Sequence, residues 1–266
     1  MRTILGLVFL GAVPILLAQT PAVTEGGVIN AASFATNQAV TPGSLVSIFG
    51  SELAGSLVQA DTIPLTAQLS NVSVTFNNVP APLLFVSGGQ INAQLPWNVL
   101  PAGTTVGTAS VVVTRGGVAS APKTVQVGPF SPGIFAANYG IGPAIAINLD
   151  GTLAAAPGAV PGLTTHPAPR ETIVIILATG LGAVDIPVAN GHDSKDQIRR
   201  TTTVPAVLFG GAAAPQVDFS GLTPQFPGVN QLNVKIPANA PVGNSVPLQL
   251  QMGGITSTNQ VTIAIQ

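Results

Sequence analysis

The sequence of 266 residues contains no cysteine, so it has neither a disulfide framework nor a thiol nucleophile. Small exported domains often need disulfides because their cores are thin, so each domain of this chain must bury enough apolar surface unaided. Hydrophobic residues make up 46% of the sequence, mostly Ala, Val, Ile and Leu. This content is sufficient for such cores.

Charged residues are also scarce. They form 6% of the chain, about a quarter of the usual share, and the formal net charge is −1. A nucleic-acid partner is excluded because phosphates are neutralised by clustered Lys and Arg, and the one basic pair, Arg199-Arg200, follows Asp193 and Asp196. Low charge with high apolar content also excludes a disordered chain.

Long helices are excluded by 24 prolines and 30 glycines, which interrupt the chain every few residues. Val72, Val74 and Phe76 alternate with polar residues, a pattern that predicts a strand with one buried face. The β-branched run over residues 173–178 predicts a strand buried on both faces. Many short strands between turn residues predict sandwiches or barrels.

Five dipeptides tolerate the positive φ angles of tight hairpin turns. They are Asn77-Asn78, Gly116-Gly117, Gly210-Gly211, Gly253-Gly254 and, outside the repeat described next, Asp150-Gly151.

One sequence pattern occurs twice. "GQINAQLPW" at residues 89–97 returns as "NQLNVKIPA" at 230–238, with Gln, Asn and Pro at matching places. Three further blocks recur in the same order: residues 42–54 with 170–182, 72–88 with 206–221, and 111–120 with 248–257. The preserved order indicates a duplicated domain.

The repeat sets the predicted domain boundaries. We expect one Ig-like β-sandwich at residues 41–129 and a second at 169–266. Residues 130–168 are expected to form a connector that carries a β-hairpin, and residues 19–40 a leader segment or an edge strand.

Residues 1–18 have the features of a cleaved signal peptide: Arg2, an apolar stretch, and small residues ending at Ala18. An uncleaved membrane anchor is the alternative, but a spanning helix needs about 20 apolar residues, and Gln19 ends this run early. The sequence therefore predicts export, to the extracellular space or the cell surface, with no membrane span after cleavage.

The blocks "GGVINAASF", "TPGSLVSIFGSELA", "NVSVTFNNVPAPLLFVSGGQINAQLPW", "PGIFA" and "ATGLG" give the chain a family resemblance. Over residues 26–266 it resembles the Solibacter uncharacterised C-terminal domain family of secreted acidobacterial proteins. The resemblance implies export and an all-β fold of two tandem Ig-like sandwiches similar to TIG-type repeats. It implies no activity and supplies no catalytic or binding residues.

Acid–base chemistry has two histidines available. His166 lies in a proline-rich stretch that we expect to be exposed, and His192 lies in the most polar loop. No Gly-x-Ser-x-Gly motif is present, although a triad built from distant residues stays open. Candidate carboxylates such as Glu52, Asp61 and Asp150 adjoin turn signals and are interpreted as surface residues.

Four oxygen-bearing side chains near His192 could hold calcium: Asp185, Asn190, Asp193 and Asp196. Their spacing follows no known calcium loop, and neighbouring cationic side chains would oppose a metal ion. We interpret the segment as a solvated loop and predict neither a metal nor a cofactor.

The repeated amides admit two interpretations. Gln90 and Asn92, like Gln231 and Asn233, occupy alternate positions and therefore share one strand face. They either form a ligand-binding pair or satisfy backbone groups of a neighbouring loop. The second interpretation is favoured because buried amides usually bond to backbone.

Trp97 and Tyr139 are the only Trp and Tyr residues. Carbohydrate modules usually present several such rings, and Trp97 follows a proline at a strand end, so a core role is favoured for Trp97.

These observations favour a non-catalytic extracellular module with a structural or adhesive role, which recognises an unidentified protein or polysaccharide at the cell surface or matrix. A carbohydrate-binding module is the alternative. A secreted hydrolase is the third reading, and fold alone does not choose among them.

Overall fold

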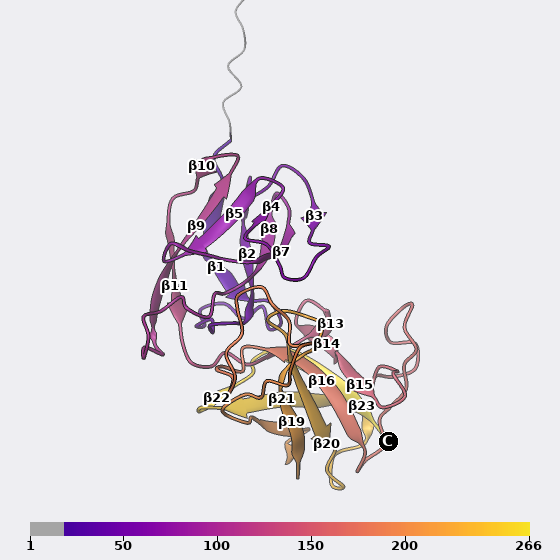
Figure 1. The fold of residues 1–266 in the computed structure, drawn as a ribbon. Helices are drawn as coiled ribbons and strands as arrows, with labels where there is room; N and C mark the ends of the chain where they lie inside the picture. The colour runs from indigo at the N-terminus through magenta and orange to yellow at the C-terminus, as the bar shows by residue number, and fades with distance from the viewer. Residues whose placement is uncertain (1–18) are drawn as a thin grey trace, which may run out of the picture.

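The computed structural model describes residues 19–266, and the expected signal peptide, residues 1–18, lies outside the described residues. Strands β1 to β23 form four sheets, and no helix occurs within residues 19–266. Figure 1 shows two sandwiches stacked end to end, the first in indigo to magenta and the second in pink to yellow. The prediction of an all-β fold with two tandem Ig-like sandwiches is confirmed.

The first sandwich contains eleven strands. They are β1 (Ala22–Asn30), β2 (Leu45–Ser51), β3 (Val58–Gln59), β4 (Gln68–Leu69), β5 (Val72–Phe76), β6 (Val79–Pro80), β7 (Leu83–Val86), β8 (Gln90–Gln94), β9 (Gly107–Arg115), β10 (Val118–Ala119) and β11 (Lys123–Val127). One sheet has the order β1-β2-β8-β7-β3. The other is built on β10-β9-β5-β4, with β11 paired to β9 and β6 to β5.

The second sandwich contains the remaining twelve. They are β12 (Gly133–Ile134), β13 (Ala136–Asn138), β14 (Ile141–Ala144), β15 (Ala146–Asn148), β16 (Ile173–Thr179), β17 (Ala206–Phe209), β18 (Ala212–Ala213), β19 (Val217–Leu222), β20 (Asn230–Lys235), β21 (Gly243–Met252), β22 (Ile255–Thr256) and β23 (Gln260–Ile265). One sheet has the order β12-β16-β20-β19 with β15 beside β16. The other has the order β13-β14-β23-β21-β17-β18 with β22 beside β21.

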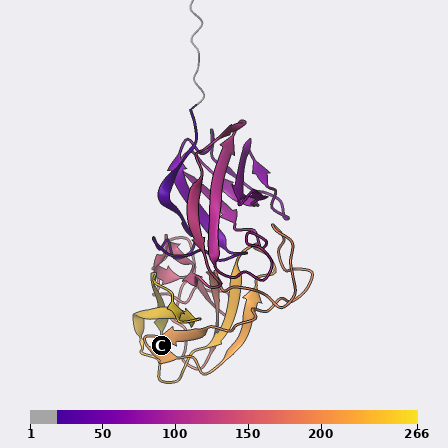
Figure 2. The same cartoon turned by 90° about the vertical axis from the view of Figure 1, so that its left-hand side faces the viewer.

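Each sandwich has its own core. The first is centred on Phe76, Ile48 and Leu83, and the second on Phe209 and Ile176, all without solvent exposure. Figure 2 shows the same stacking from the side, with the start of the described chain on the first sandwich and the C-terminus on the second. Within residues 19–266 no helix is long and apolar enough to cross a membrane.

The predicted turns occur where the sequence places them. Asn77 and Asn78 have φ of 50° and 63° and join β5 to β6. Gly210 and Gly211, with φ of 57° and 88°, join β17 to β18 in the second sandwich. Positive φ at both central residues is the requirement of a two-residue hairpin turn, which Asn and Gly meet at low cost.

The alternating strand prediction is confirmed for β5, in which Val72, Val74 and Phe76 are fully buried. The prediction that residues 173–178 are buried on both faces is wrong. Val174 and Ile176 of β16 are buried, but Ile173 and Ile175 are only half-buried. Their sheet is antiparallel and packs one face on the core, so the other face keeps partial contact with solvent.

The repeated blocks occupy corresponding strands. β2 pairs with β8 in the first sandwich as β16 pairs with β20 in the second, and β5 pairs with β9 as β17 pairs with β21. The sequence repeat therefore reflects the same antiparallel pairings made twice.

Two flanking segments contribute strands. β1, within the expected leader segment, pairs with β2 at the edge of the first sheet. The segment at residues 130–168, expected to be a connector with a hairpin, contains the β13–β14 hairpin and supplies strands to both sheets of the second sandwich. Its Ile134 and Ala146 lie in the second core, so it belongs to that sandwich.

Candidate functional site

The repeated amides lie on the outer face of the first sheet. In β8, Gln90 and Asn92 point away from the core that Ile91 and Ala93 enter. Gln90 Nε2 donates a 2.8 Å hydrogen bond to Asn92 Oδ1, and Ser47 Oγ donates to the same oxygen at 2.9 Å. The interpretation that these amides bond to loop backbone is wrong. Side chains two residues apart on a strand project from the same face, so the Gln90 and Asn92 amides are close enough to bond to each other.

The second sandwich repeats this bond. Gln231 Nε2 donates to Asn233 Oδ1 at 2.8 Å on β20. A phenylalanine lies opposite the asparagine in both copies: Phe85 opposite Asn92, and Phe219 opposite Asn233. In the second copy, however, the Arg200 guanidinium lies 5.1 Å from the centroid of the Phe219 ring. A cation therefore covers this ring.

A series of aromatic rings continues from the first amide pair toward the second sandwich. Phe49 of β2 lies opposite Gln90. The Phe34 ring centroid is 6.3 Å from that of Phe49 and 5.6 Å from that of Tyr139, the latter in an edge-on arrangement. Tyr139 is 79% exposed and occupies the turn between β13 and β14, so the series crosses from one sandwich to the other.

We call this surface the aromatic–amide face. It consists of Phe34, Phe49, Phe85, Gln90, Asn92 and Tyr139, and the fully buried Ser47 supports it through its hydrogen bond to Asn92. None of its side chains is charged. At the Tyr139 end, a pocket of about 300 Å³ is lined by Phe34, Phe135 and Tyr139, and the rest of its lining is alanine and Gly140.

The junction between the sandwiches is tied by buried polar contacts. Gln94 is 1% exposed; its Oε1 accepts a 2.6 Å hydrogen bond from the Gly191 backbone N–H, and its Nε2 donates to the Gly43 carbonyl at 3.2 Å. On the other side, Asn30 Nδ2 donates to the Ser131 carbonyl at 2.7 Å. Side chains of the first sandwich thus satisfy backbone groups of the second.

Trp97 is packed at this junction. Its backbone N–H donates to Asn190 Oδ1 at 2.9 Å, and Asn190 Nδ2 donates to Asn98 Oδ1 at 3.0 Å. The indole lies against Gly43, where a Cβ atom would overlap the ring. Trp97 is therefore a packing residue, but between the sandwiches and not within a sandwich core. A cleft of about 320 Å³ adjoins it and is also lined by Phe130.

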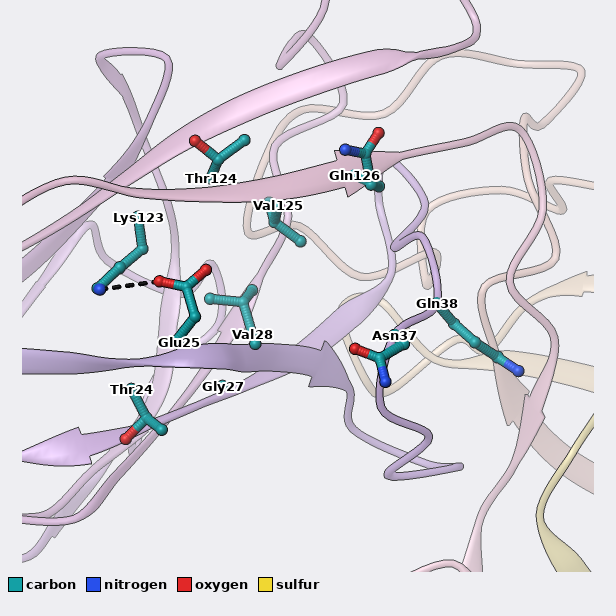
Figure 3. Close-up of a pocket in the computed structure, with 11 residues that line it drawn as sticks. Thr24, Glu25, Gly27, Val28, Asn37, Gln38, Lys123, Thr124, Val125 and Gln126 are labelled. Carbon is teal, nitrogen blue, oxygen red and sulfur yellow. Dashed lines mark hydrogen bonds and ion pairs between the residues drawn. The ribbon is translucent and has the colours of Figure 1, made fainter.

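A separate groove of about 320 Å³ runs along the open seam of the first sandwich, between edge strands β1 and β11. In Figure 3, Val28 and Val125 point into the space between these strands, and Lys123 reaches Glu25 across it. The Lys123 Nζ to Glu25 Oε2 distance is 2.9 Å. Charged side chains at a strand edge oppose pairing with another strand, so this ion pair protects the seam.

The two histidines lie in different surroundings. His166 Nε2 lies 2.8 Å from Asp150 Oδ2, and His166 Nδ1 lies 2.8 Å from the Pro167 carbonyl oxygen. The hydrogen bond to Asp150 raises the pKa of His166. Both ring nitrogens of His166 therefore have a hydrogen-bond partner within the protein. His192 is exposed in the loop before Asp193.

The four oxygen-bearing residues weighed for calcium have separate partners. Asp196 binds Arg199 with both oxygens, at 2.6 and 3.0 Å, and this hydrogen bonding lowers the pKa of Asp196. Asp185 Oδ1 accepts the Arg200 backbone N–H at 2.9 Å, Asp193 Oδ1 accepts that of Lys195 at 3.3 Å, and Asn190 binds at the junction. Within residues 19–266, no three His, Asp or Glu side chains gather as metal ligands would.

The other weighed carboxylates lie at the surface. Glu52 binds Arg115 with an Oε2 to NH1 distance of 2.7 Å, and Asp61 is exposed at the rim of a pocket beside Leu45. Sequence reasoning missed Phe34, Phe49 and Phe85 as members of a site. The alternation in β2 and β8 was the available signal, because it places Phe49 and Gln90 on outward-facing positions.

No family model and no curated protein matches the chain. One similar solved structure is the Bacteroides ovatus mixed-linkage glucan utilization locus protein SGBP-B, in complex with a mixed-linkage heptasaccharide. Its TM-score is 0.35 at 15% identity, over 94% of this chain and 47% of that one, so this chain spans about half its length.

Two further solved structures are similar over most of this chain. The I9–I11 tandem of titin gives a TM-score of 0.22 at 12% identity, over 93% of this chain and 67% of that one. Domains 5–6 of the S-layer protein SbsC give 0.25 at 12% identity, over 92% and 98%. Identities and TM-scores this low assign none of these proteins' ligands or assemblies to this chain.

Proposed function

We propose that this chain is a non-catalytic binding module of the cell exterior, in which two sandwiches form one stiff unit that holds a binding surface in place. The partner is a protein or polysaccharide of the surface or matrix. The observation that carries this proposal is the junction. Domains of one chain move relative to each other by default, so a stiff pair needs specific contacts between the domains.

The junction contacts support stiffness because they are buried and geometrically specific. Besides Gln94 and Asn30, the Thr179 hydroxyl accepts the Leu45 backbone N–H at 3.0 Å and donates to the Gly228 carbonyl at 2.6 Å. Breaking such contacts leaves buried polar groups without partners, which costs about 1–3 kcal/mol per group. Bending between the sandwiches is therefore opposed by several such costs at once.

The side chains that could do acid–base chemistry support a non-catalytic role. His166 is held between two acceptors, and the carboxylates of Asp196 and Glu52 are bound by arginines. A general base must reach a substrate proton, and these side chains are instead engaged in contacts within the protein.

Export and family membership are part of the same proposal. The signal features of residues 1–18 support export, and the repeated sequence blocks support membership of the Solibacter uncharacterised C-terminal domain family. N-terminal sequencing of the protein recovered from culture medium tests the cleavage after Ala18.

The functional test compares a strain that lacks the gene with its parent, in surface attachment and matrix composition. We expect a measurable change in one of these properties, restored by the wild-type gene. Unchanged attachment and matrix would count against the proposal. Reproducible hydrolase turnover by residues 19–266 that is lost in His192→Ala would overturn it in favour of an enzyme.

A further inference from the structure

We propose that the aromatic–amide face binds a neutral polysaccharide chain. This inference rests on the proposed function as a non-catalytic binding module, and it assigns that module a site and a ligand class.

The amides supply prearranged hydrogen-bonding groups. Asn92 Oδ1 accepts from both Gln90 Nε2 and Ser47 Oγ, which fixes the orientation of both amides. Within residues 19–266 no side chain or backbone group bonds to Asn92 Nδ2 or Gln90 Oε1, so donors and acceptors stand side by side on a half-buried surface. A sugar hydroxyl is both donor and acceptor and matches such a pair.

The rings supply the apolar contact that a sugar face needs. Phe49 and Phe85 flank the amides on neighbouring strands, since each lies opposite a β8 amide residue. Phe34 and Tyr139 extend the series beyond β2. With strands about 4.8 Å apart, the full series spans roughly 20 Å, which suits several linked sugars better than one ring. Aromatic side chains pair an apolar ring surface with adjacent polar groups at recognition sites.

The uncharged composition of the face selects a neutral ligand. Placing an ionised carboxylate or sulfate of an acidic polymer against these rings and amides would remove water from the charge without supplying a counter-charge. Neutral hydroxyls exchange bonds to water for bonds to amides, which costs little.

The second sandwich provides an internal comparison. It keeps the Gln231–Asn233 bond, but Ile175 and Leu177 stand where the first copy has Ser47 and Phe49. Arg200 also covers Phe219 there. The equivalent surface therefore has neither the hydroxyl nor the extended ring series, and we expect it not to bind.

The test is affinity electrophoresis of residues 19–266 in native gels that contain neutral or acidic polysaccharides. The neutral probes are hydroxyethyl cellulose, laminarin and glycogen, and the acidic probe is alginate. We expect retardation by at least one neutral probe and none by alginate. Tyr139→Ala should weaken that binding about tenfold, while Leu149→Ala, which truncates another highly exposed apolar residue, should leave it unchanged.

The matched pair of amide variants gives the sharpest comparison. Asn92→Asp replaces the free donors with a charge and should also weaken binding about tenfold or more. Asn233→Asp makes the same change in the second copy and should have no effect. Melting temperatures measured by circular dichroism confirm that each variant is folded before its binding is compared.

Three results would overturn the inference: no retardation by any neutral probe, retardation that survives both Asn92→Asp and Tyr139→Ala, or equal losses in Asn92→Asp and Asn233→Asp. In each of these cases an altered matrix in the deletion strain would leave the proposed function standing. Polysaccharide hydrolysis that is lost in His192→Ala would overturn both this inference and the proposed non-catalytic function.

Discussion

The substitution Gln94→Met should weaken the junction while leaving each sandwich core intact. Methionine fills nearly the same volume but forms neither of the two hydrogen bonds that Gln94 makes. The Gly191 N–H and the Gly43 carbonyl are both buried, so both would lose their partners. Only the Gly191 N–H belongs to the second sandwich, so at about 1–3 kcal/mol for each orphaned group the junction should lose roughly 1–3 kcal/mol, and the loss at the Gly43 carbonyl falls on the first sandwich.

Trp97 makes this loss measurable because it is the only tryptophan and lies at the junction. Its fluorescence during urea unfolding reports the junction, while far-UV circular dichroism reports all the strands. In the wild-type chain the two transitions should coincide, as expected for one cooperative unit. In Gln94→Met the fluorescence transition should move to lower urea than the dichroism transition.

Gln90→Met is the matched control, because it makes the same substitution four residues earlier on the same strand at a half-buried position. It should change stability by less than about 1 kcal/mol. The reasoning is refuted if Gln94→Met shifts both transitions together by no more than the control does. That result would mean that the junction contacts contribute nothing beyond packing.

Three further predictions concern other parts of the molecule. Gly43→Ala should cost about 2–4 kcal/mol in chemical unfolding, because the new Cβ overlaps the Trp97 ring and Gly43 has a φ of 81°. The pKa of His166 is raised by its hydrogen bond to Asp150, so this pair stabilises the fold fully below the ordinary pKa of 6.5 and loses that effect as the pH rises through the raised pKa. The melting temperature of His166→Gln should therefore lie below that of the wild type at acidic pH and approach it at alkaline pH. Millimolar calcium should leave the melting temperature unchanged, since the Asp196 carboxylate is bound by Arg199, and a rise of several degrees would refute this.

The strands that the sequence predicted well have local signals. Residues 72–76 alternate strictly, and the Asn77-Asn78 turn follows directly, so both the buried face and the hairpin could be read from adjacent residues. Strands β12 to β15 have no such signal, because they are two to four residues long and interrupted by glycine and proline. Their place in the second sandwich depends on pairing with β16 and β23, which lie far along the chain.

The candidate site was predictable only where its residues are neighbours in the sequence. Alternation places Gln90 and Asn92 on one face, but it does not say whether the amides bond to each other or to a loop. The answer depends on the Ser47 hydroxyl, which comes from β2 and adds a second donor to Asn92 Oδ1. The Phe34–Tyr139 contact depends on how the two sandwiches meet, and no periodic pattern in the sequence contains that information.

The contact between the two sandwiches gives this chain a surface that a single sandwich lacks. Phe34, Phe49 and the amides belong to the first sandwich, whereas Tyr139 comes from the turn that precedes β14 of the second. Gly140, next to Tyr139, packs so tightly against the Ser33 carbonyl that a Cβ atom there would overlap it. The aromatic series is therefore continuous only while the junction holds Gly140 against the first sandwich. Stiffness and the proposed recognition therefore depend on the same contacts, because the contacts that oppose bending also bring the rings of the two sandwiches together.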